Sequence, residues 1–153
     1  MAKQIEVRGL KELAQRFKDY PQKYIKVMAK TMTTALLVLW EKVPGYPPPP
    51  SGSKYRRTGT LGRSLGIGMS GGKMGQPDIF TVKKMGGSNF KGTFGTRLGY
   101  AKHVIGDRSQ QSSFFSQYWW RLEQTTGRAF HKIVSVFNIA TDALAKFLEG
   151  KGL

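Results

Sequence analysis

The most regular pattern of apolar and polar positions in the chain runs from Gln22 to Val43. Apolar residues recur there at intervals of three and four, as Tyr24, Val27 and Met28 show, while lysines occupy the opposite side. This spacing predicts an amphipathic helix of about 33 Å, at ~1.5 Å per residue. Residues 35–40 are apolar on every side, so we expect the sheet to cover one face and a neighbouring subunit the other.

A second long helix is predicted from about Gly127 to Glu149. Thr125 or Thr126 is the expected N-cap, and Gly150 stands where a helix-terminating C′ glycine is common. A second apolar stripe, at positions 136, 139 and 143, predicts contacts beyond the chain's own sheet. The main seam steps by three and four through Phe130, Ile133, Phe137, Ala140, Leu144 and Phe147.

The rest of the chain predicts a small antiparallel sheet and short helices. Residues 3–9 alternate polar and apolar as an edge strand does, and Pro21 separates a short helix over 10–20 from the long helix. After Gly59, glycine-rich turns alternate with short β-prone runs, which predicts three or four antiparallel strands. These runs are Leu61–Met69, Ile79–Met85 and Thr93–Leu98, and a turn of helix is expected over Gly99–Gly106.

Residues 44–65 form a distinct Pro-rich basic segment, which we call the arm. The consecutive prolines Pro47–Pro50 fix the backbone torsion φ and lack N–H donors, so they exclude a helix or a central strand. They favour an extended polyproline II segment of ~3.1 Å per residue. Basic residues follow on a Gly/Ser/Thr-rich backbone, and we expect them to contact a partner surface or DNA. They are Lys54, Arg56, Arg57 and Arg63.

Aromatic residues are concentrated between Phe114 and Trp120. Such a density is typical either of a core plug or of an interface, where large rings dominate the energetics. We take the two tryptophans of this segment and three residues of the long helix as candidates for a subunit interface. The five candidates are Leu36, Leu37, Trp40, Trp119 and Trp120.

These elements together predict one α+β domain over residues 1–153. In it, the long N-terminal helix and the C-terminal helix pack on a small antiparallel β-sheet, with an extended Pro-rich arm and Gly-rich loops. The expected parts are an N-terminal strand and helices (1–43), the arm (44–65), the Gly-rich sheet (66–106), an aromatic loop (107–126) and the C-terminal helix (127–150).

The charge balance narrows the choice of partners. The chain has 25 Lys and Arg against 9 Asp and Glu, and its formal net charge of +16 implies contact with phosphate or with acidic protein surfaces. Much of the excess lies in residues 44–108, where 11 basic residues face 2 acidic ones. The expected loop-tip basic residues there are Lys73, Lys83, Lys84 and Lys91.

Catalysis, cofactors and metal binding are not expected. The run Gly66–Gly71 matches G-x-G-x-x-G, but Pro77 follows it and no helix opens, so a dinucleotide site is excluded. His103 and His131 stand apart from any carboxylate at metal-ligand spacing, and the acids are scattered rather than paired. Cysteine is absent, so disulfides and thiolate metal sites are excluded. No apolar run approaches the length of a membrane span, so we expect a soluble protein that does not contact membranes.

Several short motifs follow one another in a recognisable order. They are Gly9–Leu13 at a helix start, Val43-Pro44 at the end of the long helix, the Tyr46–Pro50 linker, Arg57–Ser64, and Gly99–Val104, followed by the aromatic segment and the last helix. In this order the chain resembles the tail-completion (head–tail joining, minor tail) proteins of long-tailed bacteriophages. The resemblance covers nearly the whole chain.

The resemblance implies a virion structural protein without an enzymatic site. Such a subunit forms a neck or tail-completion ring that joins the connector to the tail tube around the DNA channel. The expected partners are further copies in a closed hexameric ring (alternatively a dodecameric one), the connector or head-completion proteins, the tail-tube proteins and the packaged DNA. The expected location is the virion tail or neck, and the host cytoplasm during assembly. The charge keeps one alternative open, a small basic nucleic-acid-binding protein that acts inside the host cell.

Overall fold

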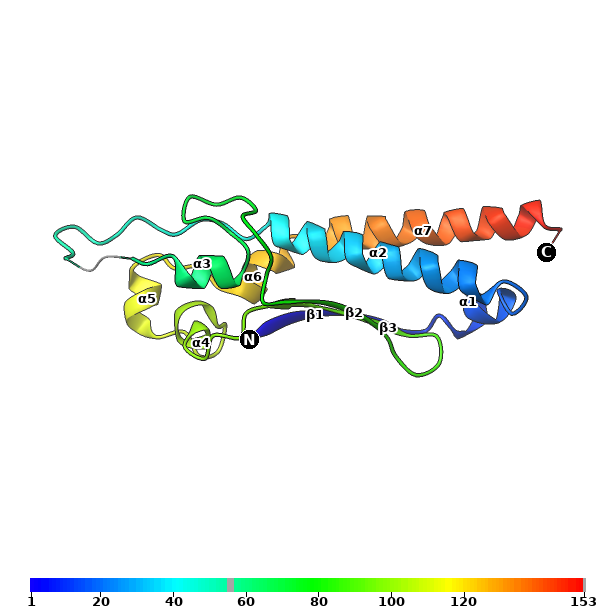
Figure 1. The fold of residues 1–153 in the computed structure, drawn as a ribbon, viewed down its shortest axis with the longest axis horizontal. Coiled ribbons are helices and arrows are strands. Elements are labelled where there is room, and N and C mark those ends of the chain that lie inside the picture. The colour runs from blue at the N-terminus through cyan, green and yellow to red at the C-terminus, as the bar shows by residue number, and fades with distance from the viewer. Residues whose placement is uncertain (55–56, 153) are drawn as a thin grey trace.

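The computed structural model describes residues 1–54 and 57–152 and has an α+β fold. The elements are β1 (Ala2–Val7), α1 (Lys11–Arg16), α2 (Pro21–Glu41), α3 (Thr60–Ser64), β2 (Ile79–Lys84), β3 (Phe90–Gly95), α4 (Ala101–Ile105), α5 (Ser112–Ser116), α6 (Leu122–Gly127) and α7 (Phe130–Gly150). In Figure 1 the two long helices lie along one side of the sheet, the short helices α3, α4, α5 and α6 gather at one end of the molecule, and α1 lies at the other end.

The sheet has three antiparallel strands in the order β1-β3-β2. The N-terminal strand predicted from residue alternation is therefore confirmed as an edge strand, and β2 forms the other edge. The register aligns both edges on the central strand, so that Ile5 and Val82 are both opposite Gly92. Because side chains alternate between the faces of a strand, every second residue of β3 points toward the helices.

The helices pack on one face of the sheet because that face is apolar. Phe90 and Phe94 are fully buried there, and α2 packs on β2, β3 and α7. At Gly92 the helix comes so close that an added Cβ would lie 2.7 Å from the Met32 sulfur and 3.2 Å from Leu36 Cδ1. The opposite face carries mostly polar residues, such as Gln4, Thr93 and Thr81.

Two clusters of buried residues line α2. Around its first half, Phe17, Met28 and Met32 pack with Phe90 and the end of α7. Around its second half, the short helices supply the cover that the sequence analysis assigned to a neighbouring subunit. The residues packed there are Leu61, Leu65, Ile67, Ala101, Val104, Ile105, Trp119, Leu122 and Ala129.

The prediction of a strand over Leu61–Met69 is wrong, because the first residues of this segment belong to the helix α3. Glycines account for the difference. The N–H of Ile67 bonds the carbonyl of Gly62 at 2.8 Å, and a Cβ on Gly62 would lie only 2.9 Å from the Ile67 oxygen. Gly66 then takes a left-handed φ of 69° and turns the chain back. This tight reversal excludes a continuous strand, and only Ile67 forms a β-bridge, to Lys73.

Helix and strand ends also differ from the predictions. The N-cap of α7 is Ala129 rather than Thr125 or Thr126, because those threonines lie inside the separate helix α6. Gly150 is the last residue of α7, and the left-handed residue is Gly152. The last strand begins at Phe90, earlier than expected, and ends at Gly95.

We predict that Gly92→Val destabilises the protein by about 1–3 kcal/mol, because the added side chain would overlap Met32 and Leu36 on α2. Urea unfolding measures the effect. Gly86→Ala is the matched control, since a Cβ there meets nothing within 4 Å. Equal stability of the two variants would contradict the close packing of α2 on the central strand.

Candidate functional site

Three hydrogen bonds hold Gly45 and Tyr46, near the start of the arm, against other parts of the chain. The N–H of Tyr46 bonds the carbonyl of Met69 at 2.7 Å, and the Tyr46 hydroxyl accepts the N–H of Gly62 at 2.7 Å. The indole N–H of Trp120 donates to the carbonyl of Gly45 at 3.0 Å. In Figure 1 the segment that follows runs from the end of α2 toward the end of the molecule where α5 lies.

Arg57 closes the arm from the other side. Its guanidinium donates to the carbonyl of Pro47 and lies over the rings of Tyr46 and Trp119, 5.8 and 5.3 Å from their centroids. The cation–π contacts and the hydrogen bond hold Arg57 against Tyr46, Pro47 and Trp119. Arg57 was predicted to contact a partner or DNA, but its charged group is engaged within its own chain.

The other predicted basic residues of the arm differ in setting. Arg63 is exposed and donates to the carbonyl of Thr58 at 2.9 Å and to the Thr60 hydroxyl at 3.3 Å. Lys54 is exposed, and Arg56 lies outside the described residues. Lys54 and Arg63 therefore carry the described cationic surface of the arm.

Of the four predicted loop-tip lysines, only Lys73 lies in a loop. Its ammonium group pairs with Glu41 at 3.4 Å and lies 5.3 Å from the centroid of the Trp40 ring. The other three are strand residues, because β2 extends to Lys84 and β3 includes Lys91. The lysine-rich sequence around the β2–β3 turn thus belongs to the sheet, not to the tip of the turn.

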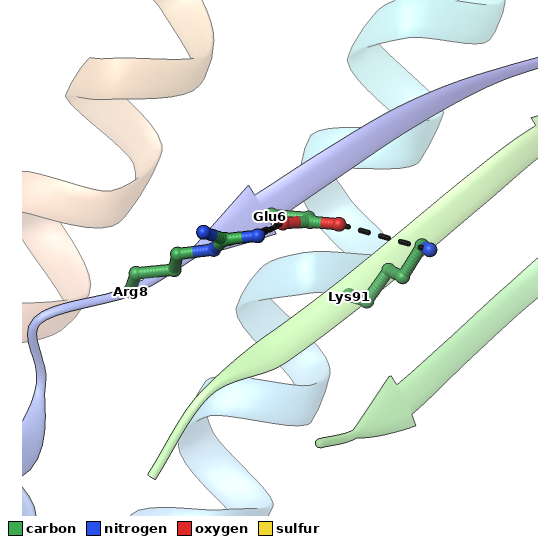
Figure 2. Close-up of polar contacts among 3 residues, drawn as sticks. All are labelled: Glu6, Arg8 and Lys91. Atoms are coloured by element: carbon green, nitrogen blue, oxygen red, sulfur yellow. Dashed lines mark hydrogen bonds and ion pairs between the residues drawn. The ribbon is translucent and has the colours of Figure 1, made fainter. Parts of the chain in front are cut away.

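Glu6 is the centre of a small charge cluster on the sheet, shown in Figure 2. Arg8 donates to its Oε2 from Nε at 3.0 Å and from Nη2 at 2.5 Å, and the Lys91 ammonium lies 3.7 Å from Oε1. The hydrogen bonds and charge of Arg8, with a smaller contribution from Lys91, hold the pKa of the Glu6 carboxyl below its ordinary value. Glu6 is therefore ionised at neutral pH and offsets part of the local positive charge.

The predicted interface residues lie mainly in the chain's own core. Leu36, Trp40 and Trp119 are buried, which corrects their assignment to a subunit interface, since they have almost no surface to offer. Leu37 and Trp120 are partly buried and pack against the same cluster. The aromatic segment is thus divided. Trp119 is buried in the core, with Phe114 and Trp120 packed against it, whereas Phe115 and Tyr118 are exposed.

Two exposed apolar surfaces were not identified from the sequence. The first is a groove of about 490 Å³ between β1 (Lys3 to Arg8) and the first half of α7. Its apolar wall consists of Phe130, Ile133, Val134 and Phe137, with Phe130 63% exposed. The sequence placed Phe130 in the apolar seam of the last helix, but the spacing of that seam does not predict that the first turn of α7 lies outside the core.

The second surface, which we call the arm-end patch, combines exposed prolines with exposed rings. Phe115 is 62% and Tyr118 85% exposed, and Tyr118 has a left-handed φ of 66°, which is uncommon for a residue with a side chain. Residues 48–51 of the arm line a hollow of about 360 Å³ with Gln117 and Tyr118. Tyr118 thus presents a large ring to solvent next to the prolines.

A polar cleft of about 610 Å³ brings together three cations that the sequence analysis did not single out. Arg97, Lys102 and Arg108 line it with Asp107 and Glu123. None of the three cations is in an ion pair within the part of the chain that the structure describes. This cleft is a suitable surface for an anionic group of a partner.

Over residues 1–54 and 57–152, no three His, Asp or Glu side chains come together as metal ligands would, and no helix has the length and hydropathy to cross a membrane. Comparison with protein-family models, curated proteins and solved structures finds no match to this chain. The candidate sites are the two apolar surfaces, the exposed cations of the arm and the cationic cleft.

We predict that Arg57→Ala destabilises the protein by about 1–2 kcal/mol, because it removes the bond to Pro47 and the contacts with two rings. Urea unfolding followed by tryptophan fluorescence measures it, and faster proteolysis within residues 48–54 should accompany it. Arg63→Ala is the control, because its bonds lie on the exposed surface. Indistinguishable variants would show that Arg57 does not hold the arm.

We predict that Arg8→Ala raises the pKa of Glu6 toward the ordinary value of a glutamate carboxyl, and that Lys91→Ala raises it less. An NMR titration of the Glu6 carboxyl in each variant gives the result. Because the pKa is lowered on folding, the contribution of these pairs to stability is present above the ordinary carboxyl range and is lost as the pH falls through the lowered pKa. A larger rise for Lys91→Ala would contradict the dominant role of Arg8.

Proposed function

We propose that the chain is a virion structural protein that forms a ring at the head–tail junction of a tailed phage. The observation that carries this proposal is the pair of unlike exposed apolar surfaces, the β1–α7 groove and the arm-end patch. Exposed apolar surfaces rimmed by polar residues are typical of protein association. The order of motifs that resembles tail-completion proteins supports the same function.

A closed ring, rather than a two-fold dimer, is expected if the groove binds a different surface of the next copy and not a second groove. In a two-fold dimer the same patch meets itself, whereas a ring joins one patch to a different one on the next copy. The groove lies beside β1 and the arm-end patch lies at α5, so each copy has distinct surfaces for a lateral neighbour and for a different partner. A hexamer is our expected ring, with the connector and the tail tube as axial partners.

The cations fit a role between acidic partners. Lys54 and Arg63 are exposed on the arm, and Arg97, Lys102 and Arg108 line one cleft. They are available for the acidic surfaces of partner proteins or for DNA passing through the channel. Such contacts need no catalytic group.

A nucleic-acid-binding protein of the host cytoplasm is the second candidate. The net charge of +16 favours it, because each phosphate contact releases counterions and strengthens binding at low salt. Stacking of single-strand bases would use the exposed rings Phe115 and Tyr118. This candidate predicts tight binding by monomers, with a steep dependence on salt.

Electron microscopy and light scattering of the purified full-length chain, alone and mixed with isolated tail tubes, test the proposal. We expect rings with an open centre, either free or on the ends of tubes, and we expect the size of these assemblies to be unchanged near physiological salt. Phe115→Ser with Tyr118→Ser should reduce tube binding and leave ring formation intact. A monomer in every mixture that binds DNA with a steep salt slope would favour the second candidate.

A further inference from the structure

The two helices cover more width than the three strands beneath them. Packed helices lie about 8–10 Å apart, and neighbouring strands about 4.7–4.9 Å. Because α2 packs on β2 and β3, α7 comes to lie beyond the β1 edge, away from β3 (Figure 2). The space under this overhang is the β1–α7 groove of about 490 Å³.

The groove has the features of an acceptor for an additional strand. Its floor is the outer edge of β1. Among the described residues β1 pairs only with β3, so the outward N–H and C=O groups of β1 have no strand partner there. Its wall is apolar, with Phe130 63% and Val134 39% exposed. Strand addition to an open edge combines main-chain hydrogen bonds with side-chain packing against such a wall.

We propose that the incoming strand is β2 of a second copy, so that the sheets of neighbouring copies join edge to edge. The inference rests on the proposed ring and identifies its lateral interface. β1 and β2 are both antiparallel to β3 and are therefore parallel to each other. Copies related by rotation about an axis roughly parallel to the strands keep this strand direction, so that β2 of one copy pairs in parallel with β1 of the next.

The register of the single chain supplies the matching of side chains. Each residue of β3 aligns one residue of β1 with one of β2 on the same face of the sheet. If these rows continue across the junction, Val82 meets Ile5, Thr81 meets Gln4, and Lys83 meets Glu6. The rows are Ile5–Gly92–Val82, Gln4–Thr93–Thr81 and Glu6–Lys91–Lys83.

The charged row shows why a second copy suits this edge. Lys83 and Lys91 are directly opposite each other, and like charges in that position are destabilising. Within the described residues Lys91 pairs with Glu6, while Lys83 has no carboxylate partner. In the joined sheet, Lys83 lies next to Glu6 of the following copy, so its charge is complemented there.

The apolar residues of β2 also support the pairing of two copies. Phe80 and Val82 are only partly buried in their own chain and lie on the helix side of the sheet. At the junction this side faces the wall formed by Phe130 and Val134. Pairing therefore covers apolar surface on both copies, which adds to the hydrogen bonds of the strands.

A competing role for Lys83 and Lys84 predicts the opposite result. Lysines on an edge strand often prevent unwanted pairing with other chains. If they serve that purpose here, neutralising Lys83 strengthens self-association. If the proposal is correct, the same change weakens it.

Cross-linking of single-cysteine variants tests the interface directly, because the chain has no cysteine of its own. Gln4→Cys and Thr81→Cys proteins, one of them carrying a mass tag, are mixed and treated with a short bismaleimide. Since each variant has one thiol, every product joins two chains. We expect the mixed product to exceed both homodimers several-fold. Gln4→Cys mixed with Lys26→Cys is the control, because Lys26 is an exposed residue of α2.

Charge reversal tests the row that contains Glu6. Lys83→Glu and Glu6→Lys should each weaken self-association roughly threefold to fivefold in light scattering, and the double variant should recover most of it. Lys26→Glu makes the same charge change away from the sheet and should have little effect. Thermal unfolding checks that each variant is folded.

Three results overturn the edge pairing. They are a mixed cross-link no more abundant than the homodimers, stronger association of Lys83→Ala, and a full-length chain that stays monomeric at every concentration. Rings in electron micrographs together with a missing mixed cross-link would overturn the edge pairing and leave the proposed function standing. A mixed cross-link without binding to tail tubes would support the edge pairing and contradict the proposed function.

Discussion

The close contact between α2 and the middle of the central strand is the constraint on which the fold depends. Gly92 leaves room for Met32 and Leu36, so the helix can lie directly on the sheet between two buried phenylalanines. That contact places α2 over β3 and β2 rather than over the centre of all three strands. The position of α7, the open β1 edge and the groove beside it all follow from this one-sided cover.

The long helices and the class of fold could be predicted from the sequence because their signals are local. Apolar spacing defines α2 and α7 within a few residues, and Pro21 marks the start of α2. The segment from Leu61 to Met69 could not be assigned this way. Its apolar residues suit a strand, but the reversal between Gly62 and Gly66 depends on contacts that only the folded chain makes.

The candidate site was less predictable, because exposure is decided by tertiary packing. Residues 35–40 are apolar all round, and the sequence does not tell whether a neighbouring copy or the chain's own short helices cover them. In the folded chain α3, α4 and α6 do so, which buries Trp40. Arg57 likewise reads as a surface cation until Tyr46 and Trp119 are found beneath its guanidinium.

The closure of the arm by Arg57 also has an evolutionary consequence. Because Tyr46 and Arg57 are both held in place by the rest of the chain, the segment between them can change in length and sequence without disturbing the core. The entropy cost of a longer loop grows only slowly with its length. Insertions and substitutions should therefore accumulate between Pro48 and Lys54, where they would adapt the same subunit to different partner surfaces.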